Sequence, residues 1–156
     1  MGTDIDMKIY IDADACPKPI KEILIKAAIR TQCELILVAN KALTVLPHPL
    51  IKTVVVSKGF DVADDYIADA VEAHDLVITA DIPLADQVID KGAVALNPRG
   101  MLYTKENIKQ RLSLRNFKEE LRSTGIHTGG PKVMSPQDIQ HFANALDRYL
   151  TKRGSS

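Results

Sequence analysis

Carboxylates that follow short apolar segments are the residues of this sequence best suited to chemistry. Asp12 and Asp14 come directly after the segment 8–11, and Asp81 follows the segment 76–79. A further acidic group lies between them in the chain, at positions 61, 64, 65 and 69. Neighbouring carboxylates repel each other unless a cation lies between them, and their oxygens suit hard ions such as Mg²⁺ and Mn²⁺. The ligands predicted for such an ion are Asp12, Asp14, Asp61, Asp64 and Asp81.

Each acid also has a structural explanation when it is taken alone. Asp12 and Asp14 can form a turn, Asp61 can cap a helix, and Asp64 can favour the positive end of that helix's dipole. The group is harder to explain in this way, because no Lys or Arg lies between residues 59 and 90 to offset its charge. Like charges four residues apart on a helix cost a few tenths of a kcal/mol per pair.

Hydrolysis of a phosphodiester is the chemistry that such a set of acids predicts. Bound metal ions polarise the phosphate and make a water molecule more acidic, while a carboxylate can orient that water or accept its proton. The residues to which the sequence assigns these catalytic roles are Asp12, Asp64 and Asp81.

The segments that must position these acids alternate between strands and helices. Apolar runs predict five strands, at 8–11, 35–39, 51–56, 76–79 and 94–96. Proline, glycine and aspartate residues delimit helices at 17–30, 62–73 and 83–91. This order predicts a three-layer α/β fold, in which a mainly parallel five-stranded sheet has helices on both faces. Ligands of such sheets bind beyond the carboxyl ends of the strands, where Asp12, Asp14 and Asp81 are expected.

The C-terminal third is predicted to consist of extra helices and to be basic. Residues 1–100 have a charge balance of −5, and residues 101–156 have a balance of +5. A bend is expected near Ser113, and a last helix follows its cap at Ser135. One basic stripe can bind a nucleic acid, or can be only a solvent-exposed helix face. It consists of Arg111, Arg115, Lys118 and Arg122. We expect one domain over residues 7–152, an extension at 1–6 and a disordered tail at 153–156.

Two further segments have residues that can bind phosphate. Arg99, in the segment Asn97–Gly100, can bind phosphate with two parallel hydrogen bonds, or can form a salt bridge with a site carboxylate. A glycine-rich loop can bind an anion through its N–H groups, or can be only a turn. Its candidate residues are Thr128, Gly129, Gly130 and Lys132.

Cysteine usage and hydropathy exclude other classes of protein. Cys16 and Cys33 are too few for a zinc site, and we expect both to be thiols, with Cys16 a small packing residue. No apolar run approaches the roughly 18 residues of a membrane span, and the first residues do not resemble a signal peptide. We therefore expect a cytoplasmic protein with no membrane partner.

Five motifs in this order resemble those of the bacterial YaiI/YqxD family. They are the segments 12–17, 59–64, 77–85, 96–100 and 128–131. That family is grouped with PIN-like domains, which are metal-dependent nucleases with acids at the carboxyl ends of a parallel sheet. The resemblance implies that Asp12 is the acid of the first strand, Asp64 the acid of the helix and Asp81 the acid of the fourth strand.

Three hypotheses for the function follow. The first is an Mg²⁺- or Mn²⁺-dependent nuclease that acts on RNA rather than DNA. The second is a phosphatase of the haloacid-dehalogenase type, in which Asp12 is the nucleophile, Asp14 the acid/base, and Asp81 with Asp86 the metal pair. The third is a protein that binds nucleic acids or nucleotides without catalysis.

Overall fold

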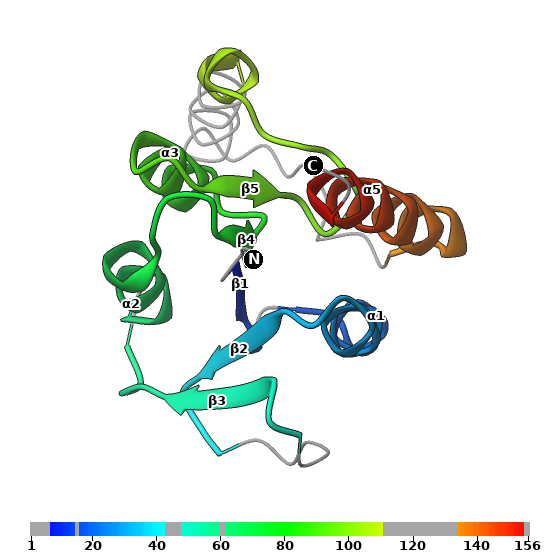
Figure 1. Cartoon of the computed structure of the whole chain (residues 1–156). Helices are drawn as coiled ribbons and strands as arrows, with labels where there is room; N and C mark the ends of the chain where they lie inside the picture. The colour runs from blue at the N-terminus through cyan, green and yellow to red at the C-terminus, as the bar shows by residue number, and fades with distance from the viewer. Residues whose placement is uncertain (1–6, 15, 43–47, 60–61, 111–133, 155–156) are drawn as a thin grey trace.

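A computed structural model describes residues 7–14, 16–42, 48–59, 62–110 and 134–154. In these parts of the chain, five strands form one parallel sheet in the order β3-β2-β1-β4-β5 (Figure 1). Their bounds are β1 Lys8–Asp12, β2 Glu34–Ala39, β3 Ile51–Val55, β4 Leu76–Ile78 and β5 Val94–Leu96. The α/β prediction is confirmed, and the structure adds that β1 and β4 are neighbours.

The described helices cover both faces of the sheet, which gives three layers (Figure 1). Helices α1 (Lys18–Thr31) and α5 (Pro136–Gly154) pack on one face, where Ile9 and Ile11 of β1 are buried. Helices α2 (Val62–Ala70) and α3 (Ile82–Asp90) pack on the other face, with Tyr10. Successive side chains of a strand point to opposite faces, so apolar strands such as β2 supply both cores.

The chain reverses its direction of travel across the sheet between β1 and β4. From β1 it passes through α1 to β2 on one side, and from β4 it passes through α3 to β5 on the other side. In open parallel sheets, a crevice forms at the carboxyl ends of the two strands between which the order reverses. The topology therefore predicts that ligands bind beyond Asp12 and Ile78, the last residues of β1 and β4.

Helix α2 ends at Ala70, three residues before the end expected from the sequence. A further turn would need the amide of Glu72 to donate to the carbonyl of Ala68. Instead, the Glu72 amide donates to Asp75 Oδ2 at 2.9 Å, and Lys91 Nζ donates to the Ala68 carbonyl at 2.8 Å. Two side chains from outside the helix thus satisfy the backbone groups that would have extended it.

The C-terminal helix α5 begins as the sequence predicts. The Asp138 amide donates to Ser135 Oγ, and the Ser135 amide donates to Asp138 Oδ2, both at 3.1 Å. This reciprocal pair is a capping box with Asp in the place of the usual Glu. Phe142, Leu146 and Leu150, which share one face of this helix, are buried against the sheet. No helix in the described parts of the chain is long and apolar enough to cross a membrane.

Candidate metal centre

Asp12 and Asp81 lie at the same edge of the sheet, after neighbouring strands. Ile11 pairs with Ile78, so the next step in the parallel register brings Asp12 level with Thr79, two residues before Asp81. Neighbouring strands are about 4.8 Å apart. Both acids are half-buried, which reduces the shielding of their charges by water. The sequence prediction that these two acids share one end of the sheet agrees with this topology.

Asp12 and Asp14 form a turn that is fixed by hydrogen bonds. The Asp14 amide donates to Asp12 Oδ1 at 3.1 Å, and Asp14 Oδ2 accepts from the Asn40 amide at 2.7 Å. Asn40 directly follows β2, so the exposed side chain of Asp14 joins the ends of β1 and β2. The turn that the sequence analysis considered as an alternative is therefore present, and it orients the Asp12 carboxylate.

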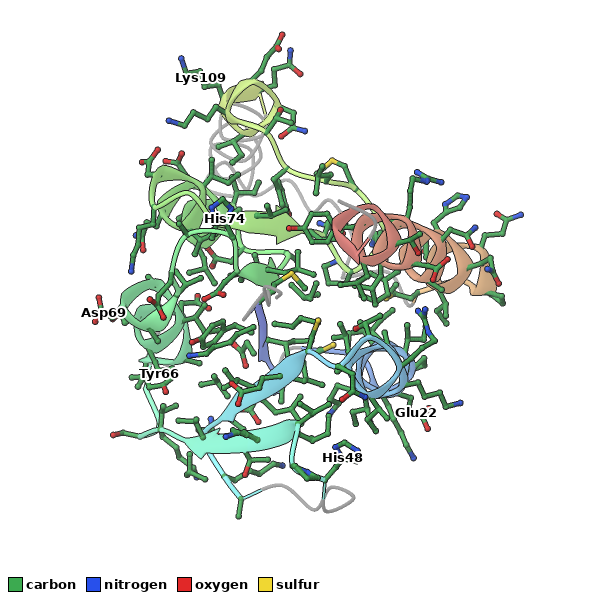
Figure 2. All side chains as sticks on the ribbon, in the orientation of Figure 1. Glu22, His48, Tyr66, Asp69, His74 and Lys109 are labelled. Atoms are coloured by element: carbon green, nitrogen blue, oxygen red, sulfur yellow. The ribbon has the colours of Figure 1, made fainter. Side chains whose placement is uncertain are left out.

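Asp64 lies in the first turn of α2 on the side that faces the sheet. It precedes the buried Ile67 and Val71 by three and seven residues, and positions with this spacing share one face of a helix. Asp64 is half-buried, whereas Asp65 and Asp69 are exposed, and Figure 2 shows Asp69 pointing away from the sheet. The helical acids thus divide into one that faces the fold and two that face water.

Asp81 is the N-cap of α3. Its Oδ1 accepts from the Leu84 amide at 2.9 Å, and its own amide donates to Thr79 Oγ1 at 2.9 Å. The helix consequently begins at Ile82, one residue earlier than predicted. In the described parts of the chain, Oδ2 of Asp81 has no hydrogen-bond or ion-pair partner, so that oxygen can bind a ligand.

The described acids suit one kind of metal ion better than others. Among the described residues, no group of three or more His, Cys, Asp or Glu side chains is arranged to hold a metal ion, and Asp61 lies outside these residues. Mg²⁺ usually keeps several waters and binds through one or two carboxylates together with substrate phosphates. Asp12 and Asp81 therefore fit an open Mg²⁺ or Mn²⁺ site, and they do not fit a closed structural site of the zinc type.

Arg99 forms a salt bridge that the sequence analysis did not identify. Its Nη1 lies 2.8 Å from Oδ2 of Asp138, in the first turn of α5. The backbone hydrogen bond from Ser135 holds the pKa of Asp138 below its usual range, and Arg99 adds to this effect. Arg99 thus links the segment Asn97–Gly100 to the start of α5. The pattern Ser-x-x-Asp at 135–138 is typical of a capping box. It indicates that the Asp138 carboxylate is held at the start of the helix, where a cation can pair with it.

The other predicted phosphate-binding residues lie outside the described parts of the chain, and so does the bend predicted near Ser113. These residues are Arg111, Arg115, Thr128, Gly129, Gly130 and Lys132.

Cys16 is buried beside the acidic turn, as expected for a packing residue. Burial raises the pKa of its thiol to about 12, although Lys21 opposes this effect and Asp12 adds to it. The thiolate is the nucleophilic form of cysteine, so the Cys16 thiol is unsuited to act as a nucleophile at neutral pH.

Alkylation should therefore distinguish the buried Cys16 thiol from an ordinary thiol. At pH 8, iodoacetamide should modify Cys16 at least about tenfold more slowly in the folded protein than in urea, because few folded molecules contain the thiolate. Peptide mass spectrometry over time measures this rate, and a Cys16→Ala variant identifies the signal that comes from Cys33. Rapid labelling of Cys16 in the folded protein would contradict the burial described above.

Comparison with known proteins determines the family. Residues 10–152 match the family described as "Uncharacterized BCR, YaiI/YqxD family". The chain belongs to the YaiI/YqxD family. It is 63% identical over 145 residues to a UPF0178 protein of Shewanella sp. (strain MR-4), which covers 93% of this chain and 97% of that protein. The similarity therefore extends over nearly all of both sequences.

Two further relatives of this YaiI/YqxD protein show similar coverage. A UPF0178 protein of Marinomonas sp. (strain MWYL1) is 60% identical over 147 residues, covering 94% of this chain and 99% of that protein. A UPF0178 protein of Colwellia psychrerythraea is 59% identical over 146 residues, covering 94% and 97%. No solved structure matches the chain. The resemblance to the YaiI/YqxD family seen in the sequence motifs is confirmed, and none of the relatives' names states an activity.

Proposed function

We propose that this YaiI/YqxD protein is a PIN-like nuclease that hydrolyses phosphodiester bonds with Mg²⁺ or Mn²⁺, and that it acts on RNA rather than DNA. The observation that carries the proposal is the position of Asp12 and Asp81 after the neighbouring strands β1 and β4, where the strand order reverses. Asp64 adds a carboxylate from a separate segment, on the α2 face turned toward the sheet. Asp12 and Asp81, which follow neighbouring strands at one sheet edge, favour a cation between them.

The roles of the acids follow from their different surroundings. Asp12 and Asp81 would hold the ion, and Asp64 would be the third acid of the site. The ion would supply charge that polarises a phosphate oxygen and makes a water molecule more acidic. Asp81 has one carboxylate oxygen fixed by the Leu84 amide, which leaves the second oxygen oriented for a ligand. Asp12 is held by the Asp14 amide in the same way. Acids fixed before the substrate arrives need little reorganisation during the reaction.

The preference for RNA rests on the resemblance to PIN-like nucleases, and charge supports a nucleic-acid substrate in general. Residues 101–156 contain 10 Lys and Arg but only 5 Asp and Glu. A basic surface beside an acidic site attracts a polyanion and leaves the divalent ion in its place. The stripe that includes Arg111 and Arg115 is the sequence's candidate for this surface.

Paired model substrates test the reaction class. With Mn²⁺, the protein should hydrolyse the diester bis(p-nitrophenyl) phosphate at least about tenfold faster than the monoester p-nitrophenyl phosphate, and it should cleave single-stranded RNA faster than the matching DNA. Chelation with EDTA should abolish both activities. Faster hydrolysis of the monoester, with a trapped phosphate on Asp12, would establish the phosphatase instead. RNA binding without any cleavage would establish the non-catalytic binder.

One contact makes the phosphatase the weaker candidate. A phosphatase of this type needs Asp14 as a proton donor, but Asp14 Oδ2 already accepts a short hydrogen bond, 2.7 Å, from the Asn40 amide. This bond occupies one carboxyl oxygen of Asp14 and joins its side chain to the end of β2, which restrains it from turning toward a substrate.

A further inference from the structure

Lys21 brings a positive charge to the acidic turn between β1 and α1. It lies in the first turn of α1, and its side chain is half-buried. Its Nζ donates to the carbonyl oxygen of Ala13 at 3.4 Å. Ala13 stands between Asp12 and Asp14, so the ammonium group is held at the turn that orients the central acid of the site.

The buried side chain of Cys16 lies next to the same turn. Lys21 lowers the pKa of its thiol and Asp12 raises it, so both charges act on this side chain.

Lys21 also differs from the cations that have a structural partner. The described ion pairs join Arg30 to Asp147, Lys52 to Glu34, Arg99 to Asp138 and Lys105 to Asp90. Within the described parts of the chain, Lys21 forms no ion pair, and its hydrogen bond is to a neutral carbonyl. A charged phosphate oxygen is a stronger acceptor for an ammonium group than a carbonyl oxygen is.

We infer that Lys21 binds a phosphate oxygen of the nucleic-acid substrate and thereby positions that phosphate beside Asp12. The inference rests on the proposed function, because it assumes that the sheet edge binds a phosphodiester. It adds a residue that the sequence motifs did not identify. The role is that of a positioning contact, made whether or not the bond is cleaved.

Binding of a fluorescein-labelled dodecauridylate in EDTA tests the inference without turnover. Lys21→Met should weaken binding roughly tenfold, since hydrogen bonds to charged groups contribute about 1.5–3 kcal/mol. The slope of log affinity against log salt concentration should fall by about 0.7, the value for one lost contact to a single strand. Lys21→Arg should keep the slope, because it keeps the charge. Fluorescence anisotropy over a series of salt concentrations measures both quantities.

Lys26→Met is the matched control, because Lys26 is an exposed lysine of the same helix. It removes the same charge from α1 away from the turn, and it should leave affinity and slope unchanged. Equal effects of the two substitutions would overturn the inference, and so would wild-type affinity in Lys21→Met or no binding by the wild-type protein. Thermal unfolding shows that the variants are folded, and Lys21→Gln replaces Lys21→Met if the latter is not.

The same series separates this inference from the proposed function. If the wild-type protein binds the oligonucleotide through Lys21 but does not cleave it with Mn²⁺, the nuclease proposal fails and the Lys21 contact stands. If it cleaves RNA and Lys21→Met binds and cleaves normally, the nuclease proposal stands and the Lys21 contact is excluded.

Discussion

Replacing Asp12 by asparagine should lower Mn²⁺-dependent cleavage of RNA at least about a hundredfold, more than the loss expected for a residue that only supports a metal ligand. Asparagine retains an oxygen that can accept the hydrogen bond from the Asp14 amide, so the turn should persist. The substitution therefore removes the charge of Asp12 while keeping its shape. Initial rates, together with Mn²⁺ affinity from isothermal titration calorimetry, measure the effect.

Asp65→Asn is the control for this prediction. Asp65 stands beside Asp64 in α2 but is exposed, so its replacement removes one negative charge from the same helix without touching the site. Its activity and Mn²⁺ affinity should remain within about twofold of the wild-type values, as expected for a screened surface charge. Normal activity and Mn²⁺ binding in Asp12→Asn would remove the central claim of the metal-site proposal.

Sequence patterns predicted the strands of the sheet because burial on both faces leaves a simple signal. Leu35 to Ala39 is an uninterrupted apolar run, and all of its residues are buried in β2. The position of Asp12 and Asp81 at the same end of the sheet also followed, because a parallel sheet gathers the carboxyl ends of its strands at one edge. These features depend on local composition and on the rules for βαβ connections, which one sequence contains.

Contacts between distant segments were less predictable. Helix α2 ends early because Asp75 and Lys91 bind its last backbone groups, and Lys91 lies more than 20 residues away in the chain. The salt bridge of Arg99 joins it to Asp138, which lies 39 residues later in the chain. Apolar periodicity predicts which face of a helix is buried. It does not predict which side chain from a distant segment contacts that helix.

In the candidate site, too, some residues could be predicted from local sequence patterns and others could not. The sequence placed acids at the correct end of the sheet, because the chain direction of parallel strands fixes that end. It did not find Lys21, whose position follows a turn and a helix start rather than an apolar strand. The only local signal for Lys21 was its place near the start of a helix that follows an acidic turn. Lysines in such places are common on protein surfaces.

Replacing Gly100 by alanine should be the most destabilising single methyl addition among the glycines described. A Cβ at Gly100 would lie 2.7 Å from the carbonyl oxygen of His141 and 3.0 Å from the amide nitrogen of Phe142, both in the backbone of α5. The φ angle of +97° adds strain for any residue with a side chain. The free energy of unfolding should fall by about 2–4 kcal/mol, the sum of overpacking and backbone strain.

Gly92→Ala separates these two causes. Gly92 also has a positive φ, +89°, but a Cβ there would approach only Ala73, at 3.2 Å from its Cβ. Its replacement should therefore cost about 1–2 kcal/mol from backbone strain alone. Urea unfolding of both variants measures the difference, which is the cost of pushing α5 away from the segment Asn97–Gly100. Equal losses would show that α5 does not pack tightly on Gly100, and that the salt bridge from Arg99 to Asp138 spans a looser contact.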